Sequence, residues 1–375
     1  MTADPAELRR SLAATLDVTE PAWRAAVEAV PRELFLGDCL LRPSGSRWER
    51  VHRDRTGEEA WLRLVYQDTT WVTQVDGVSA ADAPGPLDGR PTSSSTLPSL
   101  IVRMLELAGL RQGEKVLEIG TGTGYSTAIL SHRLGDQHVH SVEYDARLAA
   151  VAADRIHAAG FFPNLVTGDG LDGHREAADY DAIVATCAVR HIPPAWLLQV
   201  RSGGTITTTI SGWMLASGLI RLTVHGDGTA TGRFTGDRIG YMLARPHERP
   251  PRPTYFQRQG QTRPTRLDPG VLDDWTGQFV AQLAAPSAEL MTTTEGVILV
   301  DVATGSQAWT EPADGGWQVH QHGPLRLWNA VEEALTAWQD AGSPPQSDFG
   351  MTVGVDGTQC VWVGTPDGPS WRLPV

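Results

Sequence analysis

Residues 116–125 read Val-Leu-Glu-Ile-Gly-Thr-Gly-Thr-Gly-Tyr, an apolar run that leads into three closely spaced glycines. The run is typical of a strand buried in a sheet, with Glu118 as its one charged residue. The glycines are spaced G-x-G-x-G, and Tyr125 stands where a dinucleotide-binding loop has its third glycine. Glycine lets the backbone approach a ligand closely. The pattern predicts a strand, a ligand-binding turn and a helix, for a ligand that needs no pyrophosphate cradle.

Strand-like and helix-like segments alternate on both sides of this turn. Strands are predicted at 115–119, 138–142, 164–167, 181–186 and 204–210, and helices at 98–109, 125–134, 146–159 and 194–200. Alternation of this kind predicts an α/β fold with a doubly wound, mostly parallel sheet. We assign residues 91–244 to this core.

The rest of the chain divides into three further regions. Residues 1–90 form an N-terminal extension in which Leu8, Leu12 and Leu16 predict a helix, whereas alternating apolar residues predict a strand within 61–75. Residues 245–254 are rich in proline and arginine and predict a linker. Residues 255–375 combine tryptophans with Asp-Gly turns, which predicts a smaller α+β domain for peptide recognition or structural support.

Charge and composition exclude several classes of partner. The net charge of −13 argues against a nucleic-acid partner, because phosphate backbones are bound by clustered Lys and Arg. Three cysteines without regular spacing predict neither a disulfide framework nor a metal site. No apolar run is long enough to span a membrane, and the first twenty residues lack the apolar core of a signal peptide. We therefore expect a cytoplasmic enzyme.

Acidic residues lie at the carboxyl ends of three of the predicted strands, where open parallel sheets bind their ligands. Glu118 is placed to face an ammonium group, Glu143 to accept two ribose hydroxyls, and Asp169-Gly170 to meet an adenine amino group. A helix cap or a solvated loop is the alternative for each acid alone. Together with the glycine turn, they predict S-adenosyl-L-methionine as cofactor and S-adenosyl-L-homocysteine as product. The predicted cofactor-binding residues are Ser93, Glu118, Gly120, Thr121, Gly122, Gly124, Tyr125, Glu143, Asp169 and Gly170.

Two further segments resemble a known family. Residues 29–35 (Ala-Val-Pro-Arg-Glu-Leu-Phe) resemble the N-terminal signature of the protein-L-isoaspartate O-methyltransferases, and residues 92–98 resemble their Thr-Ile-Ser-x-Pro segment. The glycine turn, the strand-end acids and Ser202-Gly203-Gly204 match in order and spacing, so the resemblance covers about residues 20–244. It implies a class I methyltransferase (Rossmann-like) fold and methyl transfer to a carboxylate of an aspartyl residue.

Departures from the family pattern bear on the acceptor. The family's Thr-Ile-Ser is replaced by Ser94-Ser95-Thr96, whose hydroxyls are predicted to hold the acceptor carboxylate; capping of the helix at Pro98 is the alternative. Arg190 and His191 are predicted to bind a second acidic group of the substrate, with a solvated loop charge as the alternative for Arg190. The family's repair enzymes are also expected to lack the C-terminal domain.

These departures resemble a divergent branch that acts in ribosomal-peptide (graspetide) biosynthesis beside ATP-grasp ligases. That resemblance implies esterification of an aspartate in a macrocyclised peptide, with closure of the ester to an aspartimide. Two other functions stay open: isoaspartyl protein repair, and a non-catalytic module that binds the precursor peptide.

Overall fold

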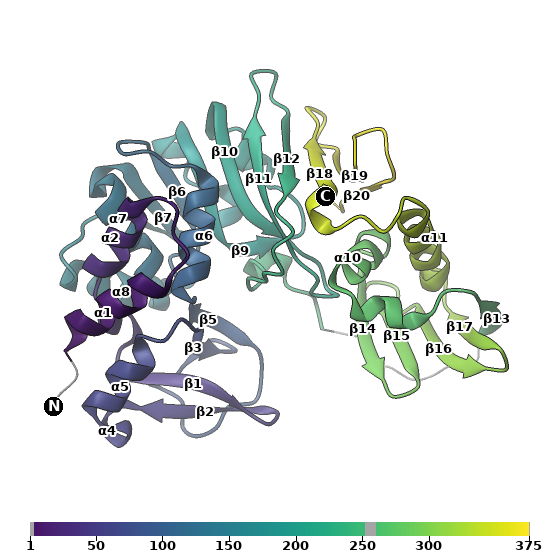
Figure 1. The fold of residues 1–375 in the computed structure, drawn as a ribbon, viewed down its shortest axis with the longest axis horizontal. Coiled ribbons are helices and arrows are strands. Elements are labelled where there is room, and N and C mark those ends of the chain that lie inside the picture. Colours follow the sequence, from purple (N-terminus) through teal and green to yellow (C-terminus); the bar gives the residue numbers. More distant parts are fainter. Residues whose placement is uncertain (1–3, 252–259, 375) are drawn as a thin grey trace. The chain divides into compact units, whose positions relative to one another are not determined.

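The computed structural model describes residues 4–251 and 260–374, which form two compact units. Unit 1 runs to Thr186 and includes Leu198–Thr207, and unit 2 comprises Cys187–Leu197 and the chain from Thr208 onward. The elements of both units are labelled in Figure 1. No helix in the described ranges combines the length and the apolarity needed to cross a lipid bilayer.

Unit 1 opens with short helices. Their bounds are α1 Pro5–Thr15, α2 Pro21–Ala29, α3 Arg32–Leu36, α4 Arg53–Thr56 and α5 Glu58–Val65. Both α1 and α2 begin with proline, whose fixed φ suits the first helical turn. The strand predicted within 61–75 is only partly right, because residues 58–65 are helical and the strand begins at Trp71. Burial of Trp61, Leu62 and Val65 on one helix face outweighed the apparent alternation.

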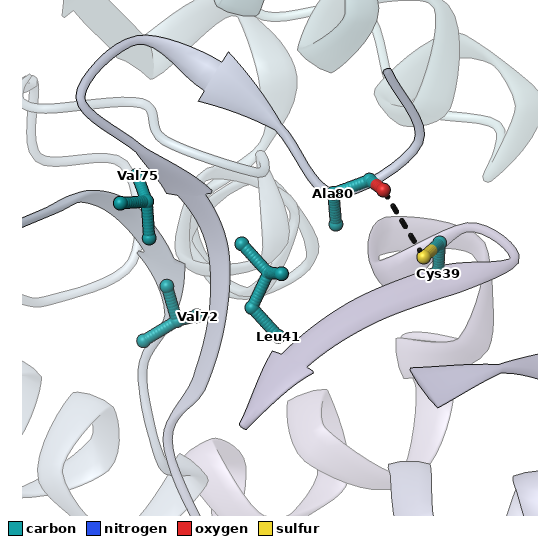
Figure 2. Close-up of a cluster of buried hydrophobic side chains, with 5 residues drawn as sticks. All are labelled: Cys39, Leu41, Val72, Val75 and Ala80. Carbon is teal, nitrogen blue, oxygen red and sulfur yellow. Dashed lines mark hydrogen bonds between the residues drawn. The ribbon is translucent and has the colours of Figure 1, made fainter. Parts of the chain in front are cut away.

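A small sheet follows these helices. Its strands are β1 Cys39–Ser44, β2 Arg47–His52, β3 Trp71–Val75, β4 Val78–Ser79 and β5 Pro91–Ser95, in the order β2-β1-β3-β4 with β5 paired to β3. Its buried cluster is drawn in Figure 2 and consists of Cys39, Leu41, Val72, Val75 and Ala80. The Cys39 thiol donates to the carbonyl of Ala80 at 3.2 Å. Strand β5 carries Ser93, Ser94 and Ser95, which together with Thr96 we call the serine row.

The methyltransferase core follows β5. It contains α6 Pro98–Ala108, β6 Val116–Ile119, α7 Tyr125–Leu134, β7 Val139–Glu143, α8 Ala146–Ala158, β8 Asn164–Thr167, β9 Tyr180–Val189 and β10 Val200–Ile210. Strand β6 pairs in parallel with β7 and β9, and β7 pairs in parallel with β8. The predicted α/β, Rossmann-like sheet is confirmed. The helix predicted at 194–200 is shorter, α9 Pro194–Leu197.

Unit 2 contains two groups of strands. The first is β11 Gly218–Val224, β12 Ala230–Phe234, β18 Phe349–Val353, β19 Gln359–Val363 and β20 Ser370–Arg372, in that order and antiparallel. The second is β13 Gln261–Thr265, β14 Ala288–Thr293, β15 Gly296–Asp301, β16 Gln307–Ala313 and β17 Gly316–His322. Helices α10 Trp275–Ala284 and α11 Leu327–Asp340 pack on one another, and α11 also contacts the second sheet.

The units divide the chain differently from the regions that the sequence suggested. Strand β12 lies in the region assigned to the core, and its partner β18 lies in the region assigned to the C-terminal domain. The predicted linker is described as far as residue 251 and contains the buried His247. Residues 252–254 of that linker and 255–259 of the predicted domain lie outside the described residues.

Candidate active site

The glycine turn between β6 and α7 has three residues with left-handed backbone. The φ angles of Gly120, Gly122 and Gly124 are +97°, +57° and +92°. A side chain is strained in this region of φ, so three such residues within five explain why the turn needs glycine. The N–H groups of Gly120 and Thr121 both donate to the carbonyl of Val142, which ties the turn to the end of β7.

Two of the glycines also permit close packing beneath the turn. A Cβ at Gly120 would stand 2.9 Å from Thr186 Oγ1, and one at Gly124 would stand 2.8 Å from Ile156 Cγ1. The Thr186 hydroxyl donates to the carbonyl of Gly120 at 2.7 Å. Sequence reasoning missed Thr186, because nothing local to β9 marks a hydroxyl that serves a turn more than sixty residues earlier.

Gly122 is less crowded and brings two predicted motifs together. The atoms nearest a Cβ at this position are the carbonyl oxygens of Ser94 at 3.7 Å and Gly120 at 3.9 Å. The backbone of the serine row in β5 therefore lies directly against the middle glycine. The structure thus joins the predicted acceptor segment to the predicted cofactor turn.

The hydroxyls of the row are divided between the two faces of β5, since strand side chains alternate. Ser93 and Ser95 are buried, and Ser93 Oγ accepts a hydrogen bond from Thr73 at 3.1 Å. The Ser95 hydroxyl is enclosed and has no hydrogen-bond partner among the residues described. Ser94 and Thr96 are half-buried on the other face. Only these two of the three predicted catalytic hydroxyls are partly exposed.

The capping alternative for this row is wrong. The N-cap of α6 is Leu97, which makes no side-chain cap bond. The N–H of Leu97 donates instead to Thr70 Oγ1 at 3.1 Å, and the N–H of Ser99 donates to Asp68 Oδ1 at 2.9 Å. Asp68 and Thr70, which precede β3, thus accept the N–H groups at the start of α6, and Ser94 and Thr96 do not cap this helix.

Glu143 ends β7 with its carboxylate under the turn. Its Oε2 accepts the N–H of Gly122 at 2.8 Å, and its Oε1 accepts the N–H of Asp145 at 3.0 Å. Burial raises the pKa of Glu143, and these backbone bonds act in the opposite direction. The predicted ribose-binding carboxylate is therefore held in place at the edge of the glycine turn.

Glu118 is placed differently from the expectation that it faces an ammonium group. Its side chain is completely buried, and its carboxylate accepts hydrogen bonds from the hydroxyls of Ser126, Thr127 and Ser141. Burial raises the pKa of Glu118, whereas the three hydroxyls lower it. In this position Glu118 anchors the start of α7 beneath the turn.

The loop after β8 approaches the same strand end. Asp169 caps the short 3-10 turn that follows, with its Oδ1 accepting the N–H of Leu171 at 2.9 Å. A Cβ at Gly170 would lie 2.4 Å from Ile119 Cγ2, so glycine is required for the loop to reach the end of β6. The predicted adenine-binding pair is therefore adjacent to the strand that leads into the glycine turn.

Arg32 is a buried residue whose role sequence reasoning missed, although it lies in the quoted N-terminal signature. Its guanidinium donates to the carbonyls of Val65, Gln67, Thr69 and, at 3.3 Å, Thr96. Burial lowers the pKa of Arg32. The N-terminal signature thus contributes a buried arginine that holds the backbone carbonyl of Thr96.

Tyr125 has a structural place next to this arginine. Its ring lies 5.7 Å from the Arg32 guanidinium and 5.7 Å from the ring of Phe35, centre to centre. Burial raises the pKa of Tyr125 to about 12. The predicted cofactor contact of this side chain is not supported, because the ring packs the N-terminal helices onto the glycine turn.

Arg190 and His191, the predicted substrate contacts, lie in unit 2 at the end of β9. The Arg190 guanidinium stacks 3.9 Å above the ring of Trp213 and donates to the carbonyl of Pro286 at 2.9 Å. The His191 ring lies 4.6 Å from that of His247, whose pKa is lowered to about 4 mainly by burial. The solvated-charge alternative for Arg190 is thus wrong. In the described ranges, no three His, Cys, Asp or Glu residues gather to hold a metal ion.

Comparison with known proteins adds to this geometry. The sequence profile described as protein-L-isoaspartate(D-aspartate) O-methyltransferase (PCMT) matches residues 50–222. A protein-L-isoaspartate O-methyltransferase of Ignicoccus hospitalis is 39% identical over 208 residues, which are 54% of this chain and 80% of that protein. Protein-L-isoaspartate O-methyltransferase 2 of a Polaromonas species is 31% identical over 190 residues, 49% of this chain and 89% of that protein.

One solved structure extends the comparison of folds over nearly the whole chain. One named protein-L-isoaspartate O-methyltransferase matches 96% of this chain and all of that chain, with a TM-score of 0.54 and 19% identity. This structure therefore matches the fold over almost the whole chain, whereas the matches to the two sequence relatives cover about half of it. A second, a putative enzyme of that name from Plasmodium falciparum in complex with S-adenosyl-L-homocysteine, covers 63% of this chain and 98% of that chain at 13% identity, with a TM-score of 0.46. The chain belongs to the protein-L-isoaspartate O-methyltransferase family, whose members are S-adenosylmethionine-dependent and act on peptide and protein carboxyl groups.

Proposed function

We propose that this protein transfers the methyl group of S-adenosylmethionine to a carboxylate of an aspartyl-type residue in a peptide or protein. The observation that carries the proposal is the contact of β5 with the glycine turn at Gly122, where Ser94 lies 3.7 Å from a Cβ position. It supports the proposal because the Ser94 backbone carbonyl lies against the turn that we propose for the cofactor, so the half-buried Ser94 and Thr96 are near that turn in the chain.

The residues present fit the proposed cofactor. Gly122 leaves room above the turn. Glu143 offers carboxylate lone pairs beyond the two that accept the N–H groups of Gly122 and Asp145, and Asp169 lies in the loop just after β8. Carboxylates at these strand ends suit hydroxyl and amino donors. When bound, the cofactor supplies an electrophilic methyl group on a sulfonium.

The acceptor carboxylate has to be oriented toward the methyl group but does not have to be deprotonated by the enzyme. An aspartyl carboxylate has an ordinary pKa of about 3.9 and is ionised at neutral pH, so no general base is required. Correct orientation of reacting groups is worth about 7–11 kcal/mol of a barrier. The half-buried hydroxyls of Ser94 and Thr96 are suited to orient a carboxylate, because they donate without the countercharge that would weaken it as a nucleophile.

An isoaspartyl carboxylate is the acceptor that the relatives support best, since they carry that substrate in their names. A second candidate is an aspartate of a macrocyclised ribosomal peptide prepared by an ATP-grasp ligase, with later closure of the ester to an aspartimide. It is favoured by one observation, the replacement of the family's Thr-Ile-Ser by Ser94-Ser95-Thr96. Arg190 and His191 are kept as proposed contacts for an acidic group of either substrate. Among residues 4–251 and 260–374, the Arg190 guanidinium, which has five N–H donors, shows one hydrogen bond, to the carbonyl of Pro286.

Three acceptors incubated with the enzyme and labelled cofactor test this function: an isoaspartyl peptide, its aspartyl counterpart, and a macrocyclic peptide with side-chain crosslinks. Mass spectrometry then reads the gain of a methyl ester or the loss of water on ring closure. Turnover of the isoaspartyl peptide alone ends the second candidate, and turnover of the macrocycle alone ends the first. The protein is produced in a host that lacks its own isoaspartyl methyltransferase, with Gly122→Val as the inactive control.

The remaining alternative, a non-catalytic binding module, is tested by calorimetry with S-adenosylmethionine. Saturable binding of the cofactor supports the enzyme. No binding at millimolar concentration, together with no turnover of any acceptor, overturns the proposed function.

A further inference from the structure

The second sheet of unit 2 ends in a strand whose outer edge has no partner strand within the part of the chain that the structure describes. Strand β13 is the last in the order β13-β17-β16-β15-β14, and among the described residues it pairs with β17 alone. Figure 1 shows β13 at this edge, near α11. Free strand edges carry unpaired N–H and C=O groups, which makes them sites for strand addition by an extended peptide.

The sequence of β13 indicates which groups face outward. In an antiparallel ladder, the N–H and C=O of a residue point to the same side, and successive residues alternate. Pro264 has no N–H, and in edge strands proline sits where that group would face away from the sheet. By alternation, Thr262 also directs its N–H and C=O outward, whereas Arg263 bonds to β17.

Helix α11 forms a wall beside this edge. Arg263 donates to Asn329 Oδ1 and to Glu332 Oε2, both at 2.6 Å, so the helix is held against β13. Two adjoining hollows, of about 350 and 480 Å3, share Arg263 and Asn329 as lining residues. Strand edge, helix flank and hollows together form a groove, which we call the β13–α11 groove.

The two hollows of the groove carry side chains of opposite charge. Arg326 lines one hollow, is exposed, and forms no ion pair with the described residues; its Nη1 donates to the carbonyl of Gly323. Exposed carboxylates of Glu333 and Asp340 line the other hollow. On a protein with a net charge of −13, a positive end of this kind selects acidic side chains.

We propose that the β13–α11 groove binds an extended segment of the peptide substrate as an added strand, with an acidic side chain of that segment next to Arg326. The proposal rests on the proposed function, because it assumes a peptide acceptor. In this proposal, unit 2 binds a segment of the substrate peptide that does not include the methylated residue.

The first test compares two substitutions at one residue by fluorescence anisotropy, without cofactor. The probe is a fluorescein-labelled peptide of alternating Thr and Val with a Glu near one end. Thr262→Pro deletes the outward N–H, whereas Thr262→Ala keeps it; both lose the hydroxyl bond to His320 at 2.7 Å. We expect Thr262→Pro to raise the Kd about fivefold, the usual effect of one backbone hydrogen bond, and Thr262→Ala to bind like wild type. Equal Kd values for the two folded variants overturn the proposal.

A second comparison stands even if Thr262→Pro fails to fold. Arg326→Gln is expected to weaken the Glu-containing probe several-fold and to leave a Gln-containing probe unchanged, because only the first has a charge to lose. The same loss for both probes, or for neither, overturns the proposal.

Activity separates this proposal from the proposed function. Thr262→Pro is expected to raise the KM of a long acceptor that includes the Thr-Val segment. The kcat and KM of a short acceptor with only the residues around the methylated site should stay unchanged. No methylation of any acceptor by wild type is a failure of the proposed function, whereas anisotropy reports on the groove independently.

Discussion

The carboxylate of Glu143 accepts the main-chain N–H of Gly122, with 2.8 Å between Oε2 and nitrogen. Its second oxygen accepts the N–H of Asp145 at 3.0 Å. One side chain at the end of β7 therefore fixes both the middle of the glycine turn and the start of the next loop. Two acceptor atoms are needed for this, which a carboxylate has and a carboxamide lacks.

Glu143→Gln is the substitution that tests this relationship. The new amide can accept from Gly122 or from Asp145 but not from both, so one N–H is left facing an NH2 group. We expect the Kd for S-adenosylmethionine to rise at least about tenfold and stability to fall by about 1–3 kcal/mol, the cost of an unsatisfied buried donor. Calorimetry and urea unfolding measure the two effects. The exposed Glu7→Gln is the control, and unchanged affinity in Glu143→Gln would show that the tether is dispensable.

Gly122→Val should abolish cofactor binding. The substitution places a branched side chain at φ +57°, in the space between the turn and the Ser94 carbonyl. Backbone strain alone costs about 1–2 kcal/mol, so a control for strain is needed. Gly160→Val supplies it, because Gly160 has φ +87° and open space around it. Calorimetry should find binding lost in the first variant and retained in the second; equal losses would mean that strain, not occupancy of the turn, explains the result.

Thr96→Ala should lower kcat and leave cofactor affinity almost intact. The Thr96 side chain is half-buried, and its carbonyl is held from behind by Arg32 at 3.3 Å, so removal of the hydroxyl leaves the backbone in place. Thr96→Ser keeps the hydroxyl and should recover most of the activity. Steady-state kinetics with calorimetry measure both quantities. Loss of cofactor affinity in Thr96→Ala would instead assign Thr96 to the cofactor site.

Glu118→Gln should change how stability depends on pH. Burial raises the folded-state pKa of Glu118 above its ordinary value of 4.5. A raised pKa means that the native state binds the proton more tightly than the unfolded state does. The contribution of Glu118 to stability is therefore complete below pH 4.5 and is lost as the pH rises through the folded-state pKa. The variant has no proton to lose, and its stability relative to wild type should therefore increase as the pH rises above 4.5. Denaturant unfolding across this range measures the difference; parallel curves would contradict the assignment.

Arg32→Lys should destabilise the protein although it conserves charge. The guanidinium serves four carbonyls from a completely buried position, and a lysine ammonium has three donors in a different geometry. We expect a loss of about 2–4 kcal/mol, because buried polar groups are left without partners. Thermal and urea unfolding measure the loss, with the exposed Arg111→Lys as the control. A change within experimental error would show that the carbonyls find other donors.

Much of the fold was predictable from short segments. The apolar run and glycine spacing of residues 116–125 correctly placed β6, the turn and α7, because strand, turn and helix preferences act over a few residues. The same reasoning failed at residues 61–66, where alternation suggested a strand. There the helix is held by burial of Trp61 and Val65, which depends on distant parts of the chain.

Residue identities and spacing were enough to predict a glycine turn with acids at neighbouring strand ends and a row of hydroxyls before α6. They did not reveal what each group contacts. Glu118 and Glu143 both lie at the carboxyl-terminal ends of strands. The first is enclosed by three hydroxyls and the second accepts the N–H of Gly122, because their surroundings come from other segments of the chain. Likewise, the approach of Ser94 to Gly122 and the support of Thr96 by Arg32 exist only once β5, α3 and the core have packed together. Local preferences specify elements, whereas desolvation and hydrogen-bond partners are set by packing.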